Sequence, residues 1–376
     1  MQPSSILSYY PTYSLLDEAR ALGQNPTNVN LFIDLKNVLR GIYLKDVVEN
    51  VVESSNHSRF VDTSIFSSLI TFLSFHKLWA YKRNVNINFF IFFETGHSVY
   101  HLNIDKDYKC SRKIASVYGV DVAYQEKFFE ILHNNLQLSE KICSVLPSVY
   151  VLRLHNLECD FIPYYLLTRA KFGQNPNQVN IIYSNDKDMW QTISERTFVF
   201  SKAGKEKKLI IPGFMKRFLK GDCDIDDSYF PLTKSIWGDK GDDIIGVNQV
   251  GNKSIIDMFS ELQPMIGSME DVYDNIQNKL PMFNMIPSKI ENKKLKRVID
   301  AELDNGLISK NVKLVSFEML SREVDDPTNS KMYERKDHIK KMLNDKKIIE
   351  LDVIQETLDR FDVTLDDGSL KTIYHL

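Results

Sequence analysis

The sequence has few cysteines and no segment typical of a membrane protein. Its four cysteines, Cys110, Cys143, Cys159 and Cys223, include no Cys-x-x-Cys pair, which argues against a disulfide framework and a structural zinc site and favours a reducing cytoplasm. No apolar run approaches the roughly 20 residues that a membrane-spanning helix needs, and the first residues lack a cationic segment followed by an apolar one. We therefore expect a cytoplasmic protein without a signal peptide or a membrane partner.

An excess of positive charge is also missing, because the formal net charge is −3 and the isoelectric point is about 6.3. This excludes a globally basic, histone-like nucleic-acid binder, but not an enzyme with a locally basic surface. Internal repeats and long low-complexity segments are absent from the sequence. With 376 residues, 43% of them hydrophobic, the chain can form one large domain or two smaller ones, and we expect a monomer.

Nearly continuous apolar runs alternate with helical patterns in the first part of the chain. Strands that are apolar at almost every position are typical of a mostly parallel sheet with helices on both faces, so we predict an α/β fold of this kind. In such a sheet, ligands bind beyond the carboxyl ends of the strands. We predict strands within 29–39, 84–96, the start of 148–173 and 179–183, helices at 63–83, 125–144 and the end of 148–173, and a hairpin at 197–211.

Acidic residues lie at or just beyond the carboxyl end of each predicted parallel strand. A single acid in such a place is usually a helix cap or a solvated turn, but several at one edge would repel each other without cations. Carboxylate-rich sites suit Mg²⁺ or Mn²⁺, and two such ions about 4 Å apart can activate a water molecule and stabilise the leaving oxygen of a phosphodiester. We therefore predict a site for two Mg²⁺ ions, with Mn²⁺ as a substitute. Its ligands would be Asp34, Glu94, Glu158, Asp160, Asp186 and Asp188.

The segment SIWGDKGDDIIGVNQVGNKSI, at 235–255, carries the most specific motif of the sequence. It resembles the Gly-Asp-x-x-Asp-Asn-Ile-x-Gly-Val-x-Gly-Ile-Gly-x-Lys signature of flap endonucleases and 5′→3′ exonucleases, the PIN-like nucleases that include phage-type ribonuclease H. The resemblance implies that Asp239 and Asp242 complete the metal site. It also implies a helix-hairpin-helix element at 235–260 that grips duplex DNA through backbone amides. The residues implied in DNA binding are Gly246, Val247, Gly251, Lys253 and Ser254.

Four earlier segments match further motifs of this family in the right order, so that the resemblance covers about residues 29–260. FIDLKNVLRG, FFETG with YKCSR, LECDFI and YSNDKDMWQ contain the six acids named above, and the resemblance implies that all six are metal ligands. It also implies that Lys109 and Arg112, in YKCSR, act as catalytic residues at the scissile phosphate. The sequence departs from the family where Glu94 replaces an Asp, Phe161 replaces a second Asp of bacterial members, and Gln249 and Asn252 replace a Gly and a Pro of the hairpin.

The resemblance also implies a domain organisation. Residues 1–28 would be an N-terminal extension, 29–260 the catalytic core and 261–376 a mainly helical C-terminal region able to recruit a replication protein. Within the last region, 306–321 is expected to be extended. We expect the helix in 148–173 to hold Glu158 and Asp160 in its first turn.

Several further features have both a functional and a structural interpretation. Residues 97–150 would form a helical arch over the site, where aromatic side chains would either stack on bases or pack in a core. A basic run at 201–221, which includes Lys207 and Lys208, would contact the DNA backbone or simply be a solvated face. Cys159 is expected to be a small packed residue rather than a reactive thiol. The aromatic residues of the arch are Tyr108, Tyr118, Tyr124, Phe128 and Phe129.

We therefore predict a divalent-metal-dependent nuclease that hydrolyses phosphodiester bonds at 5′ ends or flaps of DNA, and of RNA primers annealed to DNA, in replication or repair. Its substrates would be DNA with a 5′ flap or a 5′ single-stranded end and RNA–DNA hybrids, in the cytoplasm of a bacterial host if the chain is phage-encoded. One alternative is a structure-specific DNA-binding protein with impaired catalysis, which Glu94 and Phe161 would favour. Another is a PIN-type ribonuclease that acts on single-stranded RNA.

Overall fold

A computed structural model describes residues 26–37, 57–110, 122–172, 175–203, 206–344 and 351–360. Within these ranges, side chains are described except for those of 57–68, 122–132, 202–208, 351 and 353. Most of the predicted N-terminal extension and the last 16 residues therefore lie outside the described part of the chain.

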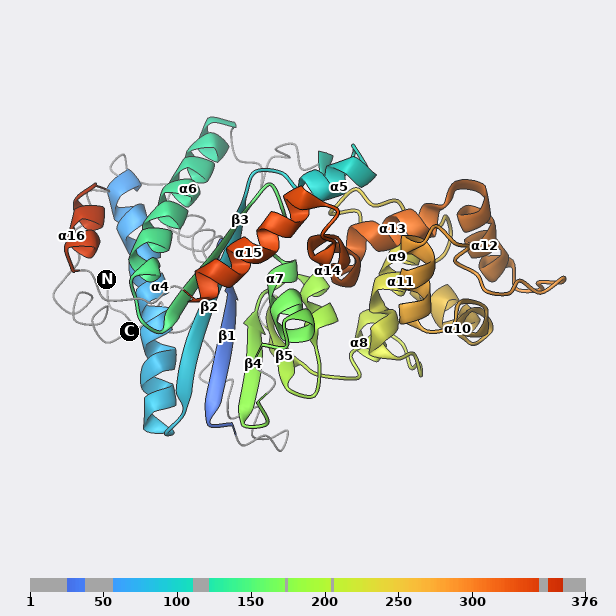
Figure 1. Cartoon of the computed structure of the whole chain (residues 1–376), viewed down its shortest axis with the longest axis horizontal. Helices are drawn as coiled ribbons and strands as arrows, with labels where there is room; N and C mark the ends of the chain where they lie inside the picture. Colours follow the sequence, from blue (N-terminus) through green and yellow to red (C-terminus); the bar gives the residue numbers. More distant parts are fainter. Residues whose placement is uncertain are drawn as a thin grey trace.

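Six strands form one sheet in the spatial order β3-β2-β1-β4-β5-β6 (Figure 1). The first five run parallel and β6 is antiparallel to β5, so the predicted, mostly parallel α/β sheet is confirmed. Chain order reverses direction between β1 and β4, and the carboxyl ends of two such strands flank the crevice where sheets of this kind bind ligands. The strands are β1 (Asn28–Asp34), β2 (Asn86–Thr95), β3 (Val149–His155), β4 (Gln178–Tyr183), β5 (Thr197–Ala203) and β6 (Glu206–Ile210).

Both faces of the sheet are covered, which explains why its strands are apolar at nearly every position. Alternate residues of β1 enter different cores: Leu31 and Ile33 belong to one, and Phe32 to the other. The first core lies under α4 (His57–Lys82), α6 (Val122–Ser144) and α16 (Leu351–Arg360).

The second core is the larger one and extends from Phe32 to Ile339. Helices α7 (Phe161–Tyr164), the π-helical η3 (Tyr165–Arg169), α14 (Phe317–Asp325) and α15 (Ser330–Asn344) cover this face, and α9 to α13 gather at the far end of the molecule (Figure 1). None of the helices in the described ranges combines the length and apolar character needed to cross a bilayer. The remaining helices are α5 (Val99–Ile104), η4 (Lys187–Thr192), α8 (Met215–Leu219), η5 (Asp227–Tyr229), α9 (Phe230–Trp237), α10 (Asn252–Ile266), α11 (Met269–Gln277), α12 (Lys293–Asn305) and α13 (Leu307–Val315).

The expectation of an extended segment at 306–321 is wrong, because this stretch forms α13 and the first half of α14. Ile308, Val312 and Val315 are buried three and four residues apart, which is the spacing of one helix face. Ser316 then separates the two helices and caps α14 by accepting a hydrogen bond from the Met319 amide.

A row of asparagines crosses the buried centre of the sheet. Asn30 of β1 lies opposite Asn88 of β2 and Asn180 of β4. The Asn30 amide donates to the Asn180 side-chain oxygen at 3.0 Å and accepts from Asn88 at 3.4 Å, while Asn180 donates to Thr197 of β5 at 3.4 Å. Because Asn30 and Asn180 are only 1% and 3% exposed, these mutual contacts satisfy polar groups that water does not reach.

Candidate metal centre

Two carboxylates leave the sheet at the ends of adjacent strands. Asp34, the last residue of β1, is 8% exposed and accepts hydrogen bonds from the Asn37 amide at 3.0 Å and the Ser184 hydroxyl at 3.2 Å. Glu94, near the end of β2, forms an ion pair with Lys36 at 2.6 Å. Parallel pairing of β1 with β2 therefore brings the two acids to the same edge, as the sequence predicts.

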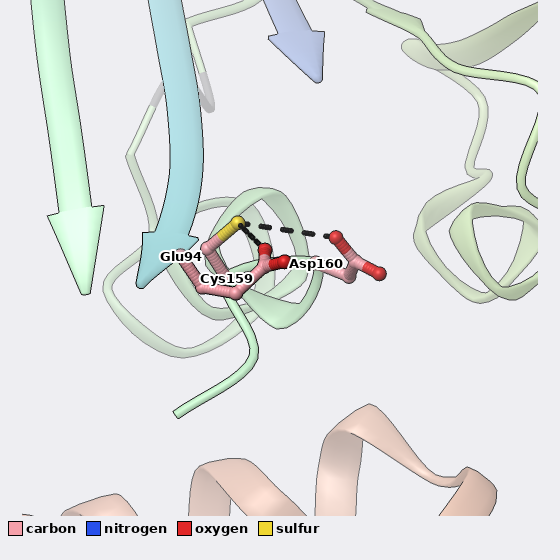
Figure 2. A group of neighbouring side chains, drawn as sticks. All are labelled: Glu94, Cys159 and Asp160. Carbon is pink, nitrogen blue, oxygen red and sulfur yellow. Dashed lines mark hydrogen bonds between the residues drawn. The ribbon is translucent and has the colours of Figure 1, made fainter. Parts of the chain in front are cut away.

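Glu94, Cys159 and Asp160 form the first group of possible metal donors, with one ligand atom of each within 4.8 Å of the others (Figure 2). The Cys159 thiol donates to Glu94 at 2.9 Å and lies 3.9 Å from an oxygen of Asp160. Glu158 and Asp160 do not lie in the first turn of a helix, which corrects that expectation: they precede α7, and Asp160 is its N-cap residue. Pro163 inside that short helix is consistent with its late start.

Asp188, Asp239 and Asp242 form the second group, again with donor atoms within 4.8 Å. Asp186 caps η4 by accepting from the Asp188 amide at 2.9 Å, and this cap fixes the loop that carries both acids after β4. A tight loop between α9 and α10 supplies the other two, because Asp239 and Ile244 exchange both backbone hydrogen bonds at 2.9 Å.

Glu158 and Lys109 connect the two groups. The Lys109 ammonium pairs with Glu158 and lies 3.8 Å from Asp242, and its amide donates to the Asp242 carbonyl at 3.0 Å. Lys109 has a φ of 56°, a left-handed conformation that costs a non-glycine residue about 1 kcal/mol or more. Tyr108 donates to Glu158 at 3.1 Å and stacks on His101 with ring centroids 4.6 Å apart. Since Tyr108 is 7% exposed, the structure favours the packing interpretation over base stacking for this residue.

Three lysines pair with these acids: Lys36 with Glu94, Lys109 with Glu158 and Asp242, and Lys234 with Asp188 and Asp239. Lys36 and Lys234 were not predicted as part of the site from the sequence. Lys234 is the only charged residue of the eight-residue α9, where it is buried among apolar side chains, and that isolation was a usable signal. Among the described residues, these three ammonium groups balance at most three of the eight carboxylate charges, which leaves an excess of negative charge in this part of the site.

The pKa directions agree with this imbalance. Burial, reinforced by Glu94 and Asp186, raises the pKa of Asp34 to about 7, although hydrogen bonds from Asn37 and Ser184 oppose the rise. Burial and the charges of Asp34 and Glu94 raise the pKa of Asp160 well above its usual range.

The neighbouring Lys109 ammonium group has the opposite effect at Glu158. Burial opposes ionisation of Glu158, but His101, Lys109 and Tyr108 hold its pKa at about 2. For Lys234, Asp188 and Asp239 outweigh the effect of burial and raise the pKa of the ammonium group. Glu158, which is paired with Lys109, thus remains charged, whereas burial raises the pKa of Asp34 and Asp160 and, despite the neighbouring Lys234 ammonium group, raises that of Asp188 to about 7.

A small pocket borders both groups. Glu158, Asp160, Asp186 and Asp188 line it together with Lys109, and the α13–α14 junction at 314–317 closes one side. A larger cavity of about 990 Å³ lies elsewhere in the second core and has none of the eight acids in its lining. The chemistry of the small pocket, rather than the size of the large one, marks the candidate site.

The loop between α9 and α10 is closely packed around two glycines. A Cβ atom on Gly246 would lie 2.6 Å from the Gly238 amide nitrogen and closer still to the Trp237 carbonyl oxygen. Gln249, which replaces a glycine of the family hairpin, adopts a φ of 61°, and Lys294 donates to its carbonyl at 2.6 Å. The turn therefore keeps a left-handed residue without the glycine.

The predicted DNA-binding residues begin in this loop, where Gly246 packs on Gly238, the neighbour of Asp239. Val247 is buried, Gly251 caps α10, and Lys253 and Ser254 lie in the first turn of α10, with Lys253 exposed. Their role in DNA binding stays a prediction. Arg112, Tyr118 and the side chains of Tyr124, Phe128, Phe129, Lys207 and Lys208 lie outside the described part of the structure.

The residues present fit hard divalent cations. All eight predicted acids converge on one edge of the sheet, and two donor groups have the compact spacing that a coordinated ion needs. Asp34 and Asp160, whose pKa values are raised, would be relieved of mutual repulsion by such ions.

The fold and this site define a class: an α/β protein whose acids meet beyond the carboxyl edge of a parallel sheet, next to a tight loop between two helices. No family model matches the chain. The fold is shared with the flap endonuclease of bacteriophage T5, in a pseudo-enzyme–product complex with DNA and metal ions, at a TM-score of 0.53 and 18% identity over 92% of this chain and 99% of that one. This likeness establishes the fold.

Curated relatives point the same way. The chain is 30% identical over 110 residues to a 5′-3′ exonuclease of Halalkalibacterium halodurans, which is 29% of this chain and 33% of that protein. It is 26% identical over 162 residues to a 5′-3′ exonuclease of Aquifex aeolicus, which is 42% of this chain and 52% of that protein. The matches thus span about a third and about half of these two relatives. The resemblance to flap endonucleases and 5′-3′ exonucleases that the motifs predict is confirmed.

Proposed function

We propose that the chain is a divalent-metal-dependent 5′ nuclease that hydrolyses phosphodiester bonds at 5′ ends or flaps of DNA. The observation that carries this proposal is the convergence of acids from five separate chain segments beyond the carboxyl edge of the sheet, where five of them belong to two groups with donor atoms within 4.8 Å. RNA primers annealed to DNA, and RNA–DNA hybrids in general, are included as substrates. We propose Mg²⁺ as the natural ion, with Mn²⁺ as a substitute.

Each part of the site has a role in the proposed reaction. Glu94 and Asp160, with Asp34 beside them, would hold one cation, and Asp188, Asp239 and Asp242 the other. Glu158 and Asp186 would serve as further metal ligands. The cations would supply Lewis-acid stabilisation of the charge that develops on the phosphodiester. Lys109, which lies between the groups, would hold a phosphate oxygen in place.

The remaining residues would position the substrate. Arg112 is proposed as a second cation at the scissile phosphate. The amides of Gly246 and Gly251 and the side chains of Lys253 and Ser254 would bind the duplex backbone. Contacts of this kind carry no sequence information and weaken as the salt concentration rises.

A cleavage assay tests the proposal. Wild type and Asp186→Ala are compared on a 5′-labelled DNA flap, a 5′ recessed RNA–DNA hybrid and unpaired RNA, each with Mg²⁺ and with a chelator. We expect cleavage of the first two substrates to need Mg²⁺ and to fall at least about a hundredfold in the variant, because a group that organises charge at the phosphate is lost. Asp300→Ala, which removes an exposed helix carboxylate, is the matched control and should cleave like wild type.

Three outcomes would contradict the proposal. Equal cleavage by wild type and Asp186→Ala would mean that the acidic site does not take part in the reaction. Tight flap binding without cleavage in either Mg²⁺ or Mn²⁺ would favour a DNA-binding protein without catalysis, and cleavage of unpaired RNA alone would favour the ribonuclease alternative.

A further inference from the structure

Cys159 lies inside the first acidic group rather than beside it. Its side chain is 1% exposed, and Figure 2 shows the sulfur atom directed at the carboxylates of Glu94 and Asp160, which come from β2 and from the loop before α7. The thiol donates to Glu94 at 2.9 Å, and an oxygen of Asp160 lies 3.9 Å from the sulfur. A sulfur donor thus shares one set of possible ligands with two oxygen donors.

We infer that Cys159 makes this group a binding site for thiophilic divalent cations such as Cd²⁺ and Zn²⁺, held by its thiolate together with Glu94 and Asp160. The inference deepens the proposed function, on which it rests for the placement of a metal at this edge. It adds that this group of residues accepts two chemical kinds of cation, which bind through different donor sets.

The distances suit such an ion. A tetrahedral zinc ion with sulfur at about 2.3 Å and oxygen at about 2.0 Å places those two donors about 3.5 Å apart. The observed separations from sulfur, 2.9 and 3.9 Å, lie on either side of that value. A side-chain movement of about half an ångström would therefore complete the geometry.

Ligand preference separates the two kinds of cation. Mg²⁺ takes oxygen ligands and keeps several waters, so it binds to the carboxylates and leaves the thiol protonated and bonded to Glu94. A thiophilic cation replaces the thiol proton: the S–H bond breaks, a sulfur–metal bond forms, and the proton passes to solvent without any change of oxidation state. Glu94 then turns from a hydrogen-bond acceptor of Cys159 into a ligand beside it.

Ultraviolet spectroscopy gives a direct readout, because a cadmium–thiolate bond has a charge-transfer band that carboxylates do not produce. Cd²⁺ is titrated into the full chain in a Cys110→Ser/Cys223→Ser background, which removes the two cysteines that are not fully buried. We expect one saturable band per chain and release of one proton per ion. Cys159→Ala should abolish the band, whereas Cys143→Ala, at a buried cysteine of the other core, should retain it.

A second variant locates the ion among its oxygen ligands. Asp160→Asn should keep the band but weaken Cd²⁺ binding about tenfold or more, since one charged ligand is lost. Thermal melting and circular dichroism establish that each variant is folded, and Cys159→Ser replaces Cys159→Ala if the latter does not fold.

The outcomes separate this inference from the proposed nuclease. A band that survives in both Cys159→Ala and Cys159→Ser, or a wild type without any saturable band, overturns the inference even if the protein cleaves flaps. A Cys159-dependent band in a protein that cleaves no substrate sustains the inference and overturns only the nuclease.

Discussion

Lys234 lies in the second acidic group with 6% of its surface exposed, and its ammonium group contacts both Asp188 and Asp239. Replacing it with methionine would keep most of the length of the side chain but leave two neighbouring carboxylates without their counter-charge. In the presence of a chelator, we expect Lys234→Met to lower the free energy of unfolding by about 3 kcal/mol or more. The reason is that removal of one partner from a buried ion pair is strongly destabilising.

Urea denaturation with and without Mg²⁺ measures this effect. Because a divalent cation replaces the lost positive charge, Mg²⁺ should restore part of the stability of Lys234→Met. Lys296→Met, which breaks an exposed pair with Asp300, is the control and should change stability by less than about 1 kcal/mol. An equally small loss in both variants would mean that Lys234 is not needed to offset the acids.

For individual residues, the sequence was informative about the acids of the site but not about the lysines that pair with them. All eight carboxylates were predicted, because a strand end or a family motif marks each position. Lys36 and Lys234 were missed, because an ion pair depends on where side chains far apart in the chain meet: Lys36 and Glu94 are separated by 58 positions. Tyr108 was left open between stacking and packing, since its burial depends on His101 and Glu158 from other segments.

In the loop between α9 and α10, adding a single methyl group at a glycine is expected to destabilise the local structure. Gly246 has no room for a side chain, because a Cβ atom would meet backbone atoms of Trp237 and Gly238 that cannot move without breaking the loop. We expect Gly246→Ala to lower the free energy of unfolding by about 1–3 kcal/mol, the usual cost of overpacking, and to weaken duplex DNA binding.

Gly251→Ala is the matched control, because nothing lies within 4 Å of a Cβ built at that position and its φ of −120° suits any residue. Thermal melting should show a large difference between the two alanine variants, and a gel-shift assay on duplex DNA reports the second effect. Equal melting temperatures for the two variants would count against close packing of this loop.

Helices and strands were predicted correctly from the sequence where the hydrophobic pattern was strong. The parallel strands that end in the acids were predicted from nearly continuous apolar runs, and β5 and β6 form the hairpin predicted at 197–211. The error at 306–321 arose because that stretch contains two short helices separated by Ser316, and each is too brief to display a long helical period.

For the molecule as a whole, the acidic edge links stability to pH and to metal. Asp34 ionises near pH 4 in the unfolded chain but has a pKa of about 7 in the folded protein. Between these values the folded state binds more protons than the unfolded state, so the free energy of unfolding that Asp34 contributes falls as pH rises from 4 to 7. Each pH unit in this window is worth at most about 1.4 kcal/mol.

Urea denaturation of wild type and Asp34→Asn in a chelator, at pH 5 and pH 8, measures this contribution. The stability of wild type relative to Asp34→Asn should decrease by a few kcal/mol between the two pH values, since the asparagine does not titrate. Saturating Mg²⁺ should reverse the trend, because the ion binds the ionised acid and its affinity rises with pH. A difference between the two proteins that does not change with pH would contradict the raised pKa of Asp34.

Distant parts of the chain also close the site. The Gln191 side chain of η4 donates to the Val315 carbonyl and accepts from the Phe317 amide, both at 3.0 Å, and Tyr100 donates to the Lys313 carbonyl at 3.1 Å. The junction of α13 and α14 is therefore held against the acidic loops by named bonds. Residues beyond 260 form a wall of the pocket as well as part of the larger core.

The asparagine row across β2, β1 and β4 has a consequence for the accuracy of the acidic edge. If β4 slipped by one residue along β1, every side chain of β4 would exchange faces, and Asn180 would lose both Asn30 and Thr197 as partners in a water-free interior. That penalty makes neighbouring alignments much less stable than the native one. The side-chain amides of Asn30 and Asn180 thereby fix the register of β1 against β4. This register in turn places Ser184 within hydrogen-bond distance of Asp34 at the carboxyl ends of the two strands.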